Sequence, residues 1–218
     1  MKKGFTLSEV LITLGVIGVV AAITMPMLIK SYQKHVTVNR LKKAYSELYQ
    51  AVNMSVNDND AVENWDFSLT IEDFCKKYMT PYLKYLKTDS FPESGKYIYK
   101  LSNGTTLQFY MGLQTKAVYG NVQIMVDING DKKPNKNGRD IFYYYILEKK
   151  SSFYNYGMGD FVNNIPYGGL YPDGYGKSRD DLKNYYWRGC NVNTGIAGAF
   201  CTALIMYDGW KISDDYNW

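Results

Sequence analysis

The sequence of 218 residues has room for one medium domain with an appendage, because a single domain usually takes about 100–200 residues. Its formal net charge of +4 is mild and evenly spread, which argues against a dedicated nucleic-acid-binding protein. The single histidine, His35, excludes multi-histidine metal sites, and the three cysteines have no C-x-x-C spacing. We therefore expect no catalytic residues, no required cofactor and no enzymatic activity.

The first feature along the chain is an uncharged stretch of 20 residues from Val10 to Ile29. At about 1.5 Å of rise per residue, a helix of this length spans the hydrocarbon layer of about 30 Å. A cleaved secretory signal fits poorly, because its apolar region has about 7–15 residues and precedes a small-residue cleavage site. Here Met25-Pro26-Met27 follows instead, and the stretch is therefore predicted to be a transmembrane helix.

An acidic residue, Glu9, stands directly before this apolar stretch. A carboxylate on the membrane side of a helix costs up to about 3 kcal/mol on insertion scales, so such a residue normally has a partner and a function. No cation lies one helical turn away within the stretch. From the residues alone, Glu9 either sits solvated among the lipid headgroups or contacts a group from elsewhere.

The residues around Glu9 form a specific pattern: a short basic leader, Gly4 before Phe5, and an acid five residues into the mature chain. This pattern resembles the prepilin signal of type IV pilins and of the pseudopilins of type II secretion. The resemblance implies that a membrane prepilin peptidase cleaves between Gly4 and Phe5 and methylates the new N-terminus at Phe5. The new α-amino group would neutralise Glu9, which thereby becomes an assembly contact within one subunit or between neighbours in a fibre.

The resemblance also predicts how the chain is divided. Residues 1–4 form the leader peptide, residues 5–29 the transmembrane and assembly helix, and residues 30–218 an extracytoplasmic head. A count of basic residues on either side of the apolar stretch favours the opposite orientation, and the resemblance overrides that count. The expected location is the bacterial inner membrane and, after assembly, a fibre at the cell surface or in the periplasm.

The helix is expected to continue into the head and to end at about residue 57. Apolar residues recur at helical spacing from Leu41 to Val56, and the polar run Asn57 to Asp60 is typical of a helix end. Pro26 is expected to kink or locally melt the helix, because proline removes a backbone donor and clashes with the preceding turn.

The middle of the head, about residues 96–148, is predicted to be a roughly four-stranded antiparallel sheet. Asn103-Gly104 is a good hairpin turn signal, because both residues tolerate positive φ. The fold class is therefore α+β, with a long N-terminal helix, whose first half spans the membrane, packed on this sheet. A short helix with Thr70 as N-cap is expected to end before Pro81. The predicted strands are Tyr97–Leu101, Thr105–Met111, Val118–Ile128 and Ile141–Leu147.

Residues 149–218 are predicted to be loop-rich, because much of this region is dominated by glycine, tyrosine, asparagine and aspartate. Its tyrosine-rich loops form either an adhesive or subunit-contact surface or an ordinary solvated one. Gly195 to Met206 is apolar and is expected to contain a short helix. Cys190 and Cys201 are the cysteines nearest in sequence, and the oxidising location that the resemblance implies favours a disulfide between them, with Cys75 left over.

The segment from Asp127 to Asp140 is the candidate metal site. Oxygen-bearing side chains at alternate positions, with glycine and proline to bend the chain, suit calcium, which takes about 6–8 oxygen ligands. The alternative is a turn between strands that Asp and Asn side chains stabilise, and four basic residues in the segment argue against tight cation capture. If calcium binds, the expected ligands are Asp127, Asn129, Asp131, Asn135 and Asp140.

The sequence thus indicates a structural subunit of a type IV pilus or of a type II secretion pseudopilus, polymerising through its hydrophobic N-terminal helix. The expected partners are copies of itself or related pilin-like subunits, the prepilin peptidase, an inner-membrane assembly platform and membrane lipid. The alternative is a protein exported by a prepilin signal that binds at the surface, in adhesion or DNA uptake, and is not a fibre subunit. Nucleic acid is expected as a partner only in the DNA-uptake variant.

Overall fold

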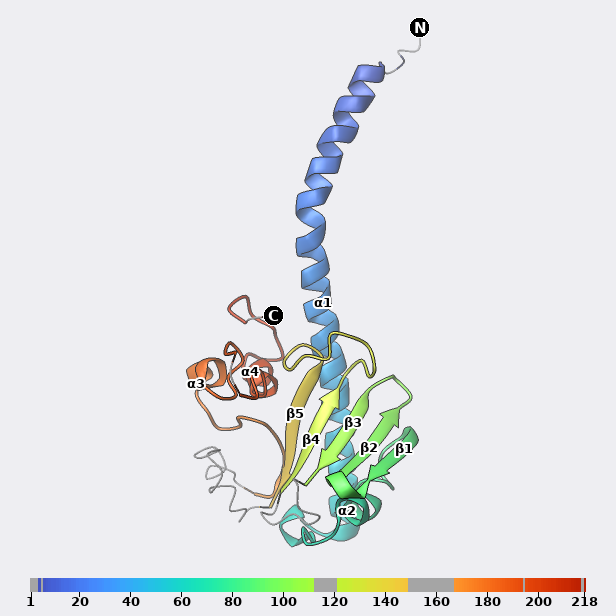
Figure 1. The fold of residues 1–218 in the computed structure, drawn as a ribbon, viewed down its shortest axis with the longest axis vertical. Coiled ribbons are helices and arrows are strands. Elements are labelled where there is room, and N and C mark those ends of the chain that lie inside the picture. The colour runs from blue at the N-terminus through green and yellow to red at the C-terminus, as the bar shows by residue number, and fades with distance from the viewer. Residues whose placement is uncertain (1–3, 5, 112–120, 149–166, 194, 217) are drawn as a thin grey trace. The chain divides into compact units, whose positions relative to one another are not determined.

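The computed structural model describes residues 4, 6–111, 121–148, 167–193, 195–216 and 218 (Figure 1). The chain forms two compact units, Met1–Val36 and Thr37–Trp218. A single helix, α1 (Leu7–Asn59), belongs to both. The division expected from the resemblance, with a leader of residues 1–4 and a head from residue 30, concerns processing and membrane position and stays a prediction.

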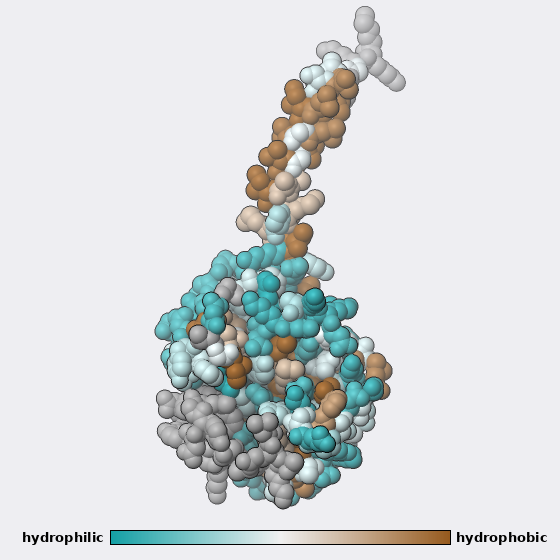
Figure 2. Space-filling model, viewed as in Figure 1, coloured by the Kyte–Doolittle hydropathy of each residue, from teal (hydrophilic) through white to brown (hydrophobic). Residues whose placement is uncertain are grey.

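In the first unit, α1 has no charged residue from Val10 to Ile29. Its large apolar side chains between Leu7 and Ile29 are 42–79% exposed, and Figure 2 shows them as an almost continuous hydrophobic surface. By length and composition α1 is able to cross a membrane. Pro26 lies inside a continuous helix, so the local melting considered for it is absent, and the kink at this residue stays a prediction. One proline removes only one backbone donor, and the hydrogen bonds of the adjacent turns keep the segment helical.

In the second unit, α1 presents one buried face. Its buried residues recur three and four positions apart, which places them on one stripe of the helix. They join the inner face of the sheet in a single hydrophobic core, as expected from the helical spacing in the sequence. The buried residues of α1 are Thr37, Val38, Leu41, Ala44, Leu48, Ala51, Val52 and Ser55.

Six strands form one antiparallel sheet in sequence order (Figure 1). Side chains of the middle strands alternate between buried and half-buried, the period expected when one face covers a core. At the turn after β2, Gly104 adopts a positive φ of 84°. The strands are β1 (Tyr85–Phe91), β2 (Lys96–Leu101), β3 (Thr106–Tyr110), β4 (Asn121–Asp127), β5 (Ile141–Leu147) and β6 (Gly169–Pro172).

The sheet is wider than the four strands predicted from sequence, by one strand at each edge. β1 escapes detection because most of its side chains are exposed and no alternating pattern develops. β6 escapes detection for the opposite reason, since all four of its residues are buried and its glycine and proline are typical of a loop.

Short helices complete the second unit. Helix α2 (Ile71–Tyr78) begins at Thr70, whose hydroxyl accepts a hydrogen bond from the Asp73 amide, as predicted for an N-cap. Helix α3 (Arg179–Asn184) and helix α4 (Cys201–Tyr207) lie in the C-terminal region, and α4 corresponds to the expected apolar helix. Two 3₁₀ turns, Val62–Asn64 and Pro92–Ser94, flank α2 and β1.

Candidate functional site

Glu9 lies in the first turn of α1, where Thr6 holds its side chain. The amide and the hydroxyl of Thr6 both donate to Glu9 Oε2 at 2.8 Å, and the Glu9 amide donates back to Thr6 Oγ1 at 3.3 Å. This reciprocal arrangement is a capping box, which fixes the start of the helix and the direction of the carboxylate. Among the described residues no basic side chain forms an ion pair with Glu9. Gly4 is exposed, and Phe5 lies outside the described residues.

The structure brings some of the predicted calcium ligands together around Asp140 and leaves Asp131 at the surface. Asp140 is buried, and its carboxylate accepts the amides of Asn135 and Lys136 at 2.7 and 2.6 Å. It also accepts the side-chain amide of Asn129 at 3.2 Å. Asp131 points to solvent with its side chain 91% exposed, and its one ion pair is with Lys100 at 3.4 Å.

The third acid of the loop, Asp127, accepts the Asn129 amide at 3.1 Å. Burial raises the pKa of Asp127 to about 6, although the amide of Asn129 acts against the shift. Asn129 Oδ1 is buried without a hydrogen-bond partner among the described residues, which leaves one unused ligand atom. Within the described part of the chain no three acidic, cysteine or histidine side chains form a cation-binding group. The arrangement is that of the Asx-stabilised turn, and calcium binding stays a prediction.

The same loop supports the C-terminal region. The side-chain amide of Asn137 donates to the Ala197 carbonyl at 3.1 Å, and the Tyr216 hydroxyl donates to the Gly138 carbonyl at 2.6 Å. A Cβ added at Gly138 would overlap Cys201 Sγ, so only glycine lets the loop approach this close. Gly138 also has a φ of 75°.

The expected disulfide is present. Cys190 and Cys201 are joined, with their Cα atoms 5.0 Å apart, and they are 11 positions apart in sequence. Cys75, the remaining cysteine, is a buried free thiol in α2, and burial raises its pKa. A thiol with a raised pKa is a poor nucleophile, so Cys75 serves as a core residue.

Two ionic clusters in the C-terminal region could not be found from sequence. Arg188 forms a buried ion pair with Asp173, at the end of β6, and also donates to the Tyr145 hydroxyl of β5. Burial raises the pKa of Asp173, and the charge of Arg188 opposes that shift. At the surface, Arg179 binds both Asp208 and Asp215 at 2.7–2.9 Å, which ties α3 to the chain after α4.

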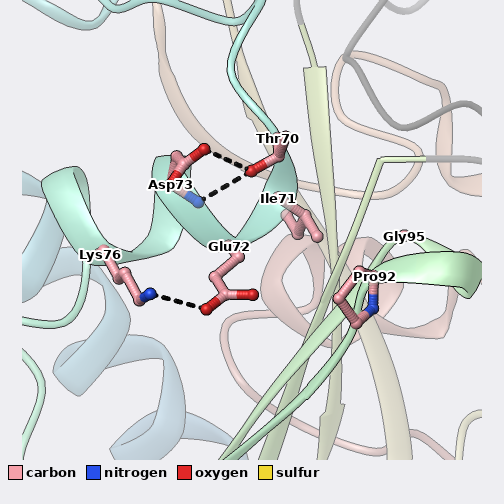
Figure 3. A pocket seen from close by; sticks show the side chains of 7 residues that line it. All are labelled: Thr70, Ile71, Glu72, Asp73, Lys76, Pro92 and Gly95. Atoms are coloured by element: carbon pink, nitrogen blue, oxygen red, sulfur yellow. Dashed lines mark hydrogen bonds and ion pairs between the residues drawn. The ribbon is translucent and has the colours of Figure 1, made fainter.

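A pocket of about 230 Å³ lies beside the start of α2 (Figure 3). Its polar side chains already have partners: Glu72 pairs with Lys76 at 2.6 Å, and the Thr70 hydroxyl donates to Asp73 at 2.7 Å. The Lys76 ammonium accordingly lowers the pKa of Glu72. These groups cap and brace the helix.

Comparison with known families divides the sequence into two parts. The prokaryotic N-terminal methylation motif matches residues 1–25. A second family model, described as "Family of unknown function (DUF6613)", matches residues 27–218. No enzyme family is detected, and no curated protein and no solved structure shows a significant match. The chain is therefore a pilin-like protein that carries a prepilin-type N-methylation signal and belongs to the family of unknown function DUF6613.

Proposed function

We propose that this protein is a structural subunit of a type IV pilus or of a type II secretion pseudopilus, assembled through the N-terminal part of α1. The observation that carries the proposal is the prepilin-type motif over residues 1–25 together with the apolar helix that follows it. A membrane holds such a helix before assembly. A fibre core made of the same helices from other subunits can hold it afterwards.

The exposure of this helix supports assembly over a purely soluble role. Large apolar side chains at successive positions, such as Leu11, Ile12 and Leu14, are 60–64% exposed in the chain by itself. Contiguous apolar surface of this kind marks a membrane or protein contact. Copies of the chain or related pilin-like subunits, with membrane lipid before assembly, are the partners that cover it.

Glu9 supplies a negative charge at the start of this apolar surface. Cleavage after Gly4 would create an α-amino group at Phe5, and the carboxylate of Glu9 would then have a cationic partner in its own or a neighbouring subunit. Such a contact would fix the register between the N-terminal helices of neighbouring subunits. A register that separates the carboxylate from the amine is unfavourable, because each charge is then left without a partner in an apolar environment.

The test uses the full chain expressed in a bacterium with a prepilin peptidase and an assembly platform. Mass spectrometry should find a mature chain that begins at Phe5 with a methylated amine, and the wild type should yield fibres in the sheared fraction. Glu9→Ala should insert into the membrane and give no fibres, whereas Glu93→Ala, which removes an exposed acid of the head, should assemble normally. A chain that retains Met1, or normal fibre yield from Glu9→Ala, would contradict the proposal.

The second candidate is a surface-binding protein that uses the prepilin signal for export only. Two exposed aromatic side chains that lie close to Cys190 in sequence, Tyr186 and Trp187, with 68% and 49% exposure, favour this candidate because such rings are common at binding surfaces. Correct processing at Phe5 with no fibres from the wild type would support it over the fibre subunit.

A further inference from the structure

The two edge strands of the sheet differ in how far their residues are buried. The last strand, β6, is buried at all four positions. At the opposite edge, β1 pairs only with β2 among the described strands, and its Leu86 and Phe91 side chains are 74% and 49% exposed. An open edge of this kind offers unpaired backbone groups to another strand.

Two side chains of β1 with opposite charges, Lys87 and Asp89, stand on either side of Thr88 and face away from the core. Lys87 lies opposite Lys100 of β2, and Asp89 lies opposite Ile98. These β2 residues alternate with the buried Tyr97, Tyr99 and Leu101, so Lys87 and Asp89 share the outer face of the sheet. Thr88, between them, lies on the core side opposite Tyr99.

We propose that β1 is a self-pairing edge, at which two copies of this chain join antiparallel with Thr88 opposite Thr88 of the second copy. In this register Lys87 of each copy is opposite Asp89 of the other, which gives two cross-strand pairs of opposite charge. Leu86 lies at the irregularity of β1 between Tyr85 and Lys87, so the regular paired segment runs from Lys87 to Asp89, and the exposed Phe91 lies beyond its end.

The charges select this register over its neighbours. Residues opposite each other must lie on the same face, so a two-fold pair of identical strands is centred on a residue. A pair centred on Lys87 would set two ammonium groups opposite each other, and one centred on Asp89 would do the same with two carboxylates. Of these three registers, only the one centred on Thr88 places each Lys87 opposite an Asp89 of the other copy. Within each copy Lys87 already approaches Asp89 at 2.9 Å, so the four charges together form one cluster.

The contact is independent of fibre formation. A two-fold pair makes the strands of the two copies antiparallel, whereas the subunits of a helical fibre repeat in one direction along it. Pairing through β1 therefore joins free subunits or subunits of different fibres, and it can be measured on unprocessed chain that does not polymerise.

The test is disulfide cross-linking of the purified full chain in detergent micelles under mild oxidation. The native cysteines do not interfere, because Cys75 is buried and the other two are joined. Thr88→Cys should give a covalent dimer about tenfold faster than Ser90→Cys, since opposed Cα atoms are about 5 Å apart and those of Ser90 would be offset by about 13 Å. Ser102→Cys, in the exposed turn after β2, measures random encounter.

Charge variants in the Thr88→Cys background test the cause. Lys87→Asp should slow cross-linking about tenfold, because two attractive pairs become repulsive, and Asp89→Lys should do the same. The double variant Lys87→Asp/Asp89→Lys should restore the rate, and Lys211→Asp, an equal charge change in the C-terminal segment, should leave it unchanged. Equal rates for Thr88→Cys and Ser90→Cys would overturn the proposal. The proposal would also be overturned if the double charge variant cross-linked as slowly as the single variants although its melting temperature equalled that of the wild type.

Discussion

Replacement of Gly138 by alanine should measure how closely the Asp127–Asp140 loop packs on the disulfide. Gly138 has a φ of 75°, and a left-handed conformation costs an alanine about 1–2 kcal/mol. The new Cβ would also overlap Cys201 Sγ and lie 3.1 Å from Tyr216 Oη. Overpacking of this kind costs about 1–3 kcal/mol, so Gly138→Ala should lower the free energy of unfolding by about 2–5 kcal/mol.

Gly104→Ala is the matched control, because Gly104 has a similar φ of 84° and no atom within 4 Å of the added Cβ. It should lose only the backbone contribution of about 1–2 kcal/mol. Both losses can be read from denaturant unfolding of the full chain in detergent, followed by tryptophan fluorescence. In a Cys190→Ala/Cys201→Ala background the excess loss at Gly138 should become smaller, because the overlapping sulfur is gone while the close approach to Tyr216 Oη remains. Equal losses at the two glycines would refute the packing argument.

Three further outcomes follow from the site. Thermal unfolding curves in calcium and in chelator should superimpose if the loop is a turn, whereas calcium at 100 times its dissociation constant would add about 2.7 kcal/mol. Arg188→Met should lower the free energy of unfolding by about 3–5 kcal/mol, because it leaves the Asp173 carboxylate buried without a partner. Adding Asp173→Leu should recover most of that loss, and a double variant as unstable as Arg188→Met would contradict the argument. Burial raises the pKa of Asp127 from 3.8 to about 6, so the folded chain holds a proton that the unfolded chain releases between these values. The contribution of this group to the free energy of unfolding is therefore fully present below about pH 4, and it is lost as the pH rises through about 6. Asp127→Asn should remove that slope, and an unchanged slope would assign it to another group.

The sequence predicts the parts of this fold whose order is local. The membrane-competent stretch is recognised from 20 consecutive uncharged residues. The buried stripe from Leu41 on α1 and the four middle strands have a periodicity that can be read within about ten residues. The cap at Thr70 depends on residues three positions apart and is also predicted. These features are independent of where the rest of the chain lies.

The remainder depends on contacts between distant segments. Arg188 and Asp173 are 15 positions apart, and nothing in either neighbourhood indicates that the fold brings the two side chains into the core together. The sequence around Gly138 is that of an ordinary turn and does not indicate that Cys201, which is distant in sequence, packs directly against this glycine. The acids of the Asp127–Asp140 loop have the composition of a cation site, and it is the backbone path that directs Asp140 inward and Asp131 outward.

The capping box at the start of α1 bears on how the proposed assembly contact would arise. Before cleavage, Glu9 Oε2 receives two hydrogen bonds from Thr6, which are neutral donors. They orient the carboxylate and leave its charge uncompensated, and that charge costs up to about 3 kcal/mol within a membrane. Cleavage after Gly4 removes Lys2 and Lys3 and leaves Thr6 as the second residue of the mature chain, so the same donors remain beside a new amine. On the proposed function, processing thus adds a charged partner to a carboxylate that is already fixed in direction, and the unprocessed chain has the orientation without the attraction.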